Sequence, residues 1–563
     1  MTRDIQNRLP EAADRWLIAR RSDAAWKERA VGLLVELLGV DTTPRSDPAA
    51  CAAAEQRCFD IIRRELAGTV PAATTHLAPI RREIAAHPYF TWPYYAGDAG
   101  DAKTDAVERV YRGRGNLFVR LARPAAPRLV INGHMDTVAP FLPVRADGNI
   151  VHGRGAVDDK GPCLSMLLAA GLLSEIGRMF GIEPACDLLL QFVIDEEPGG
   201  NGSLSAALDV KPTPPDAVVV LECTEMTAYP ANRGAVWHAT RLESASCGHE
   251  VLLEAMAFVL GGLDDFGRAL KAESDHPLFP HRPVQTCHGR LGPFGVHPSR
   301  VQDYVRLHLR WEGIPRSEVV AVVDEAVREY CRVYGDKTQP GAGDAVLAQH
   351  LRWSDAAEDR AVLEIFGLAG HMGAVDRLDG AITKAGAIIR KLVRTRTARG
   401  GAWNSLHIAL ADADGGHSLE LEGGQGFLPT HEMEAVCERM RQAVRAATRE
   451  YLALTGRAAD AIRATVTFEK LHNAAFARRT DGPAMRAILA AAGAVGAYHG
   501  EPVRGWDVSC DARIFAKEFP DAEVITFGPG LLARAHANDE QIDIHDVLIA
   551  AEVLARSALT YQP

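Results

Sequence analysis

The sequence predicts an α/β protein in which a domain with a largely parallel sheet is interrupted by an inserted α+β domain. Short apolar strands alternate with helices from 115 to 225, and this texture returns after residue 480. Longer amphipathic helices and alternating strands fill the region between. Wholly apolar strands between helices indicate a parallel sheet covered on both faces, whereas alternating strands indicate an antiparallel sheet covered on one face. We therefore expect one domain over 1–229 and 473–563, interrupted by a second domain over 230–472.

The individual elements follow from the spacing of apolar residues. Helices are expected where these residues recur with the helical period, over 27–40, 50–66, 161–176, 250–270, 317–334 and 431–454. Strands are expected at NLFVRL, RLVINGH, DLLLQFVID, AVVVLE and EVITFGPG in the first domain, and at YVRLHLRW and SLELEG in the second. A doubled α+β unit is one interpretation of the inserted region. The segment 79–111, which contains HPYFTWPYY, is expected to be an inserted loop, and long loops in compact domains are often functional.

Composition and charge argue against several classes of protein. The 563 residues suggest two or more domains, and the net charge of −11 argues against a nucleic-acid-binding surface. The charged start MTRDIQNRLPEAADRW lacks the apolar core of a secretory signal. No apolar run approaches the roughly 20 residues that span a bilayer, so no membrane partner is expected. The ten cysteines are scattered without a CxxC pair, which favours reduced thiols and a cytoplasmic location.

Two clusters of potential metal ligands lie in the first half of the chain. His134 and Asp136 follow a buried strand in LVINGHMDTV, and alternation puts both side chains on one side of the chain. An imidazole there could bind a metal while the carboxylate orients it. Asp158 and Asp159 lie in the Gly-rich segment GRGAVDDKGP, just before a helix. Adjacent carboxylates could bind cations or cap the helix, and for Asp159 we favour capping.

Further acidic and histidine side chains follow other expected strands. Glu196 and Glu197 end a buried strand in FVIDEEPGGNGS, Glu222 ends another in VVVLECTEM, and His536 follows a late strand and a Gly/Pro turn. In open α/β sheets ligands bind at the carboxyl ends of the strands. Two histidines and several carboxylates at one sheet edge suit zinc, which takes imidazole nitrogen and carboxylate oxygen. The motifs use no cysteine as a ligand, which disfavours a structural zinc site.

Taken together, these motifs resemble the di-zinc metallopeptidase family that includes aminoacylase, carboxypeptidase G, succinyl-diaminopimelate desuccinylase, acetylornithine deacetylase and carnosinase. The matching strings are GHMDTV, GRGAVDDKGP, DEEPGGNGS, LECTE, SCDAR and FGPG…AHANDE, in the order of the family. The resemblance covers roughly 110–235 and 480–563. It implies a zinc-peptidase catalytic domain interrupted by a lid and dimerisation domain, and hence a homodimer. The inserted region is larger than in most members of the family.

The resemblance also implies a ligand set for two divalent metal ions, with zinc expected and cobalt or manganese compatible with the same ligands. One ion would be held by His134, Asp158 and Glu222, and the other by Asp158, Glu197 and His536. Asp158 would therefore bridge the two ions. Asp136 would orient His134, and Glu196 would be the general base beside the ligand Glu197.

The resemblance implies further residues in the inserted domain and near the C-terminus. A histidine of the inserted domain would stabilise the oxyanion, and His249 is the first candidate, with His238 as the alternative. The small residues that follow this histidine in the family are absent after His249, where HEVLLEAM begins a helix. Arg513 in SCDARIF could bind a substrate carboxylate or form a structural ion pair. Arg310 in LHLRW is a second substrate-binding candidate.

The expected function is hydrolysis of an amide bond in a small dipeptide or N-acyl amino acid, by a metal-bridged hydroxide with Glu196 as general base. Such an enzyme would be a metallopeptidase, carboxypeptidase or deacylase. One alternative is an amide-forming transacylase or a specialised amidase using the same site. Another is a binding protein without activity, although such a protein would not need Glu196. A serine or cysteine hydrolase fits poorly, because no GxSxG elbow is present and Cys163 lies in an expected buried helix.

Overall fold

In the computed structural model the chain divides into two compact units, each described by itself. Unit 1 comprises Met1–Arg233 and Ala475–Pro563, and unit 2 comprises Gly234–Ala474. The sequence places the corresponding boundaries at 229/230 and 472/473. The structure describes residues 9–96, 102–298, 300–339, 346–355, 357–371, 379–413, 415–470 and 472–562.

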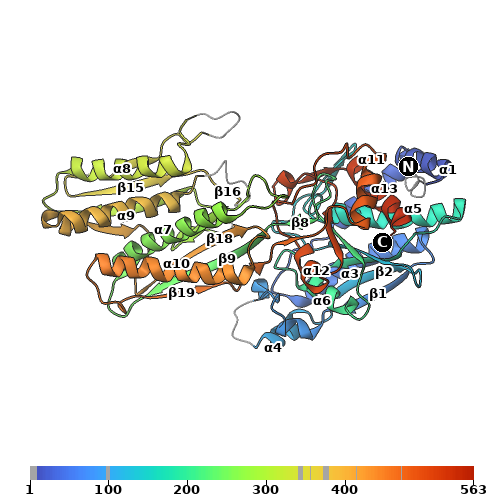
Figure 1. Cartoon of the computed structure of the whole chain (residues 1–563), viewed down its shortest axis with the longest axis horizontal. Coiled ribbons are helices and arrows are strands. Elements are labelled where there is room, and N and C mark those ends of the chain that lie inside the picture. The colour runs from blue at the N-terminus through green and yellow to red at the C-terminus, as the bar shows by residue number, and fades with distance from the viewer. Residues whose placement is uncertain are drawn as a thin grey trace. The chain divides into compact units, whose positions relative to one another are not determined.

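Unit 1 is built on a six-stranded sheet whose central part is parallel (Figure 1). In spatial order its strands are β1 (Thr74–Pro79), β2 (Gly115–Leu121), β6 (Asp187–Val193), β3 (Arg128–His134), β7 (Ala217–Leu221) and β22 (Glu523–Phe527). The last four run parallel, and β1 and β2 form an antiparallel edge. The α/β fold with a mostly parallel sheet is confirmed. In the register, His134 pairs with Val193 and Leu221 with Phe527, so these strands end at one edge of the sheet.

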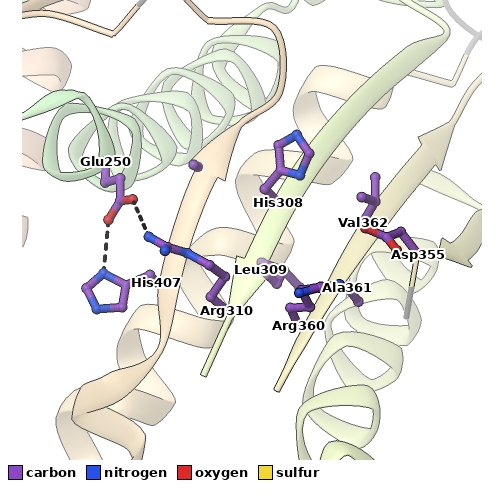
Figure 2. A pocket seen from close by; sticks show the side chains of 10 residues that line it. Glu250, His308, Leu309, Arg310, Asp355, Arg360, Ala361, Val362 and His407 are labelled. Carbon is purple, nitrogen blue, oxygen red and sulfur yellow. Dashed lines mark hydrogen bonds and ion pairs between the residues drawn. The ribbon is translucent and has the colours of Figure 1, made fainter. Parts of the chain in front are cut away.

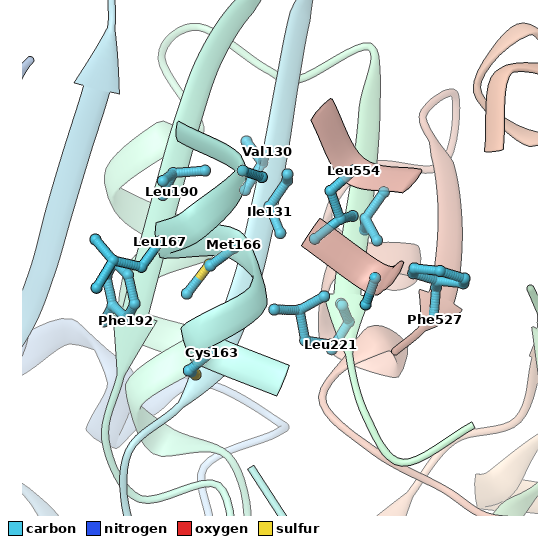
Figure 3. Close-up of a cluster of buried hydrophobic side chains, with 14 of the residues drawn as sticks. Val130, Ile131, Cys163, Met166, Leu167, Leu190, Phe192, Leu221, Phe527 and Leu554 are labelled. Carbon is cyan, nitrogen blue, oxygen red and sulfur yellow. The ribbon is translucent and has the colours of Figure 1, made fainter. Parts of the chain in front are cut away.

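Both faces of this sheet are covered, since every residue of β6 and β7 is buried. The helices of unit 1 are α1 (Glu11–Arg21), α2 (Ala24–Leu38), α3 (Pro48–Thr69), α4 (Lys103–Val110), α5 (Lys160–Phe180), α6 (Asn201–Val210), α11 (Pro483–Ala494), α12 (Ala512–Glu518) and α13 (Ile544–Thr560). Met166 of α5 and Leu554 of α13 belong to the apolar cluster over the strands (Figure 3). Among the described residues α5 is the one helix long and apolar enough to cross a membrane, and it is mostly buried in this core.

Unit 1 also contains short helices and strands outside the six-stranded sheet. The segment expected to be a loop contains two single-turn helices, η1 (Arg82–Ala86) and η2 (Tyr94–Ala96), and also the regular helix α4, which its irregular composition did not predict. A three-stranded sheet is formed by β4 (Arg145–Asp147), β5 (Ile150–His152) and β23 (Gln541–Asp543). Another single turn, η5 (Leu532–Arg534), follows β22, and two short strands, β8 (Ala231–Asn232) and β21 (Phe476–Ala477), pair with each other.

Unit 2 consists of two βαββαβ subdomains, the second inserted into the first (Figure 1). The outer subdomain contains β9 (Gly234–Glu243), α7 (His249–Glu273), β10 (Thr286–Leu291), β18 (Ser418–Phe427), α10 (Met433–Leu454) and β19 (Arg463–Thr467). The inner one contains β13 (Tyr304–Arg310), α8 (Arg316–Tyr334), β14 (Leu351–Ser354), β15 (Arg360–Phe366), α9 (Ala381–Arg399) and β17 (His407–Leu410). The minor elements are β11 (Phe294–Gly295), β12 (Arg300–Val301), β16 (Gly370–His371), η4 (Gly401–Ser405) and β20 (His472–Asn473).

The two subdomains share one topology. In both antiparallel sheets the four main strands lie in the order second, third, first, fourth, as β10-β18-β9-β19 and as β14-β15-β13-β17. The helices α7 and α9 join the subdomains by close packing. At Gly386 of α9, an added Cβ would lie 2.9 Å from Leu260 of α7, so glycine permits this approach. The enlarged inserted domain is therefore a doubled α+β unit.

Candidate metal centre

Five side chains from separate segments of unit 1 meet at the carboxyl edge of the parallel strands. His134 is the last residue of β3, Glu222 directly follows β7, and Glu197 lies in the loop after β6. Asp158 precedes α5, and His536 lies between η5 and β23. We call these five residues the carboxylate–histidine cluster. They are the residues that the sequence predicts as metal ligands.

The centre of this cluster is the Asp158 carboxylate, whose two oxygens face different imidazoles. Asp158 Oδ1 lies 3.0 Å from His134 Nε2, and Asp158 Oδ2 lies 3.2 Å from His536 Nε2. His536 Nε2 is also 3.0 Å from Glu197 Oε1. A Glu222 oxygen lies within 4.8 Å of an Asp158 oxygen. Asp158 thus belongs to two sets of possible ligands. One set is Asp158 with His134 and Glu222, and the other is Asp158 with Glu197 and His536.

The spacing and chemistry of these groups fit a pair of divalent cations. Ligands about 2.1 Å from a tetrahedral zinc ion lie about 3.4 Å from one another, slightly longer than the distances of 3.0–3.2 Å around Asp158. Imidazole nitrogen and carboxylate oxygen suit zinc, cobalt and manganese. Cys223 also lies near Asp158, and burial raises the pKa of its thiol well above the usual value.

The electrostatics of the cluster favour a bound cation. Burial, together with the charge of Asp158, raises the pKa of Glu222 well above its usual value. Burial acts against ionisation of Asp158 as well, but hydrogen bonds from His134 and His536 lower its pKa overall. The charge of Glu197 raises the pKa of His536 to about 12. Buried carboxylates that outnumber their cationic partners are stabilised by metal coordination.

Asp136 makes hydrogen bonds at the site that the sequence does not predict. Its carboxylate accepts hydrogen bonds from the backbone amides of Glu196 (3.1 Å) and Glu197 (3.0 Å). The expected contact with His134 is made more closely by the Asp136 carbonyl oxygen, 3.1 Å from His134 Nδ1, than by the carboxylate at 3.5 Å. Asp136 therefore orients the imidazole through its backbone and holds the Glu196 loop, residues 194–200, through its side chain.

Glu196 extends from this loop beside the cluster. In the described part of the chain no hydrogen bond is recorded for its carboxylate, so its oxygens are available to a substrate or water. Burial and the nearby charge of Asp511 raise its pKa well above the usual value. A carboxylate so placed can exchange a proton with a molecule bound at the cluster.

Two residues that support the cluster were missed or misread in the sequence. Glu540, one of the acids in AHANDE, is buried and accepts hydrogen bonds from the amides of Gly155, Val157 and Asp158 at 3.0, 2.9 and 3.2 Å. No local pattern distinguishes it from an exposed acid. Asp159 makes no side-chain cap for α5, contrary to the expectation. Instead, Asp159 Oδ2 accepts a hydrogen bond from the backbone amide of His134 at 3.1 Å.

The expected role of Arg513 as a substrate anchor is not supported by its position. The side chain is only 2% exposed. It donates to the carbonyl oxygens of Cys510 (3.0 Å) and Gly199 (2.9 Å) and pairs with Asp511 at 3.1 Å. These contacts use the guanidinium to tie the α12 segment to the Glu196 loop. The geometry therefore matches the alternative interpretation, a structural ion pair.

The remaining candidates lie in unit 2. His249 is the first residue of α7 and is half-buried. Arg310 projects from β13 into a pocket of about 310 Å³ on the open face of the inner sheet, where its guanidinium is 3.8 Å from Glu250 (Figure 2). His238 is only 2% exposed, and its Nδ1 lies 3.0 Å from the Thr240 hydroxyl oxygen. The roles of His249 and Arg310 at the metal centre stay predictions.

His371 of the inserted domain lies in LAGHMGA (368–374), where Met372 follows it and Gly373 and Ala374 come next. Its backbone belongs to β16, which pairs with β12. The side chain of His371 and residues 372–378 lie outside the described residues.

Comparison with known proteins agrees with this architecture. Residues 130–560 match the family described as Peptidase family M20/M25/M40. A protein of Aspergillus terreus named as a carboxypeptidase is 37% identical over 117 residues, which are 20% of this chain and 26% of that protein. A protein of Pyrococcus abyssi named as a LysW-lysine/LysW-ornithine hydrolase is 25% identical over 280 residues, 46% of this chain and 78% of that protein. The chain thus covers only about a quarter of the Aspergillus relative.

Solved structures with a similar fold extend over nearly the whole chain. Human carnosine dipeptidase 1 aligns with a TM-score of 0.52 and 12% identity over 98% of both chains. The M20 family metallo-carboxypeptidase Sso-CP2 of Sulfolobus solfataricus aligns with a TM-score of 0.51 and 12% identity, over 94% of this chain and 98% of its own. The family match covers more than half of the chain and includes every residue of the carboxylate–histidine cluster. The chain belongs to the M20 family of metallopeptidases.

Proposed function

We propose that this protein hydrolyses an amide bond of a small dipeptide or N-acyl amino acid at the carboxylate–histidine cluster, with two divalent metal ions bound there. The observation that carries the proposal is the position of Asp158 between two imidazoles, with one oxygen facing each. His134, Asp158 and Glu222 would hold one ion. Asp158, Glu197 and His536 would hold the other. Zinc is the expected metal, and cobalt and manganese fit the same donors.

The proposed chemistry divides between the metals and the protein. Bound divalent ions supply Lewis acidity, which lowers the pKa of water and polarises a carbonyl group. Glu196 takes a proton from the attacking water and then delivers it to the leaving amine nitrogen, so that water and amide become acid and amine. Asp136 keeps Glu196 in place because its carboxylate accepts hydrogen bonds from the backbone amides of Glu196 and Glu197. A histidine of the inserted domain, with His249 as the candidate from the sequence, would donate to the developing oxyanion.

Small amides are favoured as substrates by the relatives rather than by a described pocket around the cluster. The relatives are named carboxypeptidase, dipeptidase and hydrolase of a lysine or ornithine conjugate. All of these names imply cleavage of an amide bond at an amino acid. An amide-forming transacylase would use the same activated acyl carbon. Product analysis with and without an added amine distinguishes the two, because transfer gives a new amide.

The test is a screen of dipeptides and N-acyl amino acids after reconstitution with zinc, cobalt or manganese, with a chelator-treated sample beside each. We expect metal-dependent release of free amino acid. Glu196→Gln should lower kcat by about 10²- to 10⁴-fold, the usual contribution of a general base, while metal content stays unchanged. Glu183→Gln, which alters an exposed glutamate of the same unit, is the matched control. Full activity of Glu196→Gln would rule out the proposed base.

A further inference from the structure

A second buried polar network lies beside the carboxylate–histidine cluster and shares none of its ligands. It consists of Glu55, Tyr95, Arg114 and Asp195, which we call the Asp195 network. Arg114 and Asp195 are 1% and 0% exposed and are joined by a 2.7 Å ion pair. Glu55 accepts from the same guanidinium at 2.6 Å. The Tyr95 hydroxyl donates to Asp195 Oδ2 and accepts from Arg114 at 2.8 Å.

Every donor of the Arg114 guanidinium has a partner in this network or next to it. Nε and one terminal nitrogen donate to Glu55, the same terminal nitrogen donates to Asp195, and the other donates to Tyr95 and to the carbonyl oxygen of Val110. A guanidinium offers five N–H groups in a fixed plane. Because all of them are used, the network has one well-defined geometry. Buried networks of this kind rigidify the segments that they connect.

The network connects the Glu196 loop to segments far away in the sequence. Asp195 is adjacent to Glu196, Glu55 comes from α3, and Tyr95 comes from the segment 79–111 that is expected to be an inserted loop. Asp195 has a φ of +58°, in the left-handed region where a residue with a side chain needs support from its surroundings. The two donors on its carboxylate give that support. The direction in which the chain enters Glu196 is therefore fixed by this network.

A second contact from the same segment holds the other end of the loop. Thr91 donates from its hydroxyl to the carbonyl oxygen of Gly199 at 3.2 Å, and its amide donates to Asn201 at 3.1 Å. Asn201 donates back to the carbonyl oxygen of Thr91 at 2.7 Å. An added Cβ at Gly199 would lie 2.5 Å from Thr91, so the two segments are in close contact. Tyr95 and Thr91 thus hold the Glu196 loop before Glu196 and after Glu197, respectively.

We propose that residues 91–95 form a positioning element, in which Tyr95, acting through Asp195 and Arg114, sets the position of the Glu196 carboxylate for proton transfer. Tyr95 is a positioning residue, since it touches Asp195 and not the reacting atoms. This inference rests on the proposed function, in which Glu196 is the base. Misplacing such a group by about 1 Å can lower a rate by about 100-fold. The segment therefore contributes to the rate, not only to the fold.

The test uses Tyr95→Phe, which removes one hydroxyl and keeps the ring. We expect kcat to fall by about 10- to 100-fold, KM to change less than about twofold, and metal content to stay at the wild-type level. Asp195→Asn should act in the same direction. Tyr498→Phe, which removes an exposed hydroxyl bound to the carbonyl oxygen of Glu501, should behave as wild type. Unchanged kcat in both Tyr95→Phe and Asp195→Asn would overturn the proposal.

Hydrogen exchange separates this proposal from the proposed function. Amides of residues 195–200 should exchange about tenfold faster in metal-loaded Tyr95→Phe than in the wild type, whether or not a substrate is known. If the wild type cleaves no amide but the exchange rises, the proposed function fails and the structural part of the inference stands. If the wild type is active and exchange in the loop is unchanged, the positioning role fails alone. A fall in activity that follows only loss of metal or of thermal stability would also overturn it.

Discussion

Two regions of buried charge in this protein, the ion pairs of unit 2 and the carboxylate–histidine cluster of unit 1, differ in how their charges are balanced. In unit 2, Lys384 and Asp379 are buried together with their charged atoms 2.6 Å apart, and Glu254 is paired with Arg396 at 2.5 Å. In unit 1, the carboxylates around Asp158 outnumber the imidazoles that face them. A buried ion pair is neutral within the fold, whereas an excess of buried carboxylate is neutralised either by protonation or by a bound cation. The cluster around Asp158 can therefore accept a cation, and the ion pairs of unit 2 need none.

The largest effect should come from the residue shared by both halves of the cluster. Asp158→Asn removes the negative charge that faces both His134 and His536. We expect loss of most bound metal and loss of measurable amidase activity, because each proposed ion loses a ligand. Metal analysis after dialysis and the substrate screen measure the two effects. Glu183→Gln serves again as control, and Asp158→Asn protein with full metal content would break the comparison between the units.

Removing one charge of the buried Lys384–Asp379 pair in unit 2 should lower the free energy of unfolding without changing the amount of bound metal. Lys384→Met leaves Asp379 buried without its cation, which costs about 3–5 kcal/mol. Urea unfolding should show the lower stability, and metal analysis below the transition should show the wild-type content. A variant with both Lys384→Met and Asp379→Leu should recover part of the loss, because no charge is left unpaired. Metal loss in the folded Lys384→Met protein would show that metal binding in unit 1 depends on the ion pair of unit 2.

A smaller effect is expected from a buried histidine of unit 2. Burial lowers the pKa of His238 from 6.5 to about 3. Below pH 6.5 the unfolded chain therefore binds a proton that the folded chain does not, so stability falls as the pH falls from 6.5 towards 3. The loss attributable to this group is about 2 kcal/mol between pH 6.5 and about pH 5.

The matched comparison is with a histidine that solvent reaches. His238→Gln should flatten the dependence of the unfolding free energy on pH, whereas His308→Gln, at an exposed position of β13, should leave the slope as in the wild type. Urea titrations at several pH values provide the slopes. If the slope of His238→Gln equals that of the wild type, the buried neutral histidine is not the cause of the acid sensitivity.

The parallel sheet could be predicted from short-range signals, because wholly apolar strands alternate with helices. The local patterns place a histidine or an acid at several strand ends, as at His134 and Glu222, but the set of five ligands came from the resemblance of six ordered motifs to a known family. The supporting groups could not be predicted in this way. Glu540 and Arg114 act through partners hundreds or tens of residues away, and nothing beside them in the sequence marks them. For Arg513 the sequence allowed either a substrate contact or a structural ion pair, and the buried pair with Asp511 matches the second interpretation.

The central claim is that Asp158 is shared by two cations, and anomalous X-ray scattering from crystals grown with zinc tests it most directly. We predict two anomalous peaks on either side of the Asp158 carboxylate, one next to His134 and Glu222 and the other next to Glu197 and His536. A single peak away from Asp158, or no peak beside Asp158 in crystals grown with excess zinc, would contradict the account.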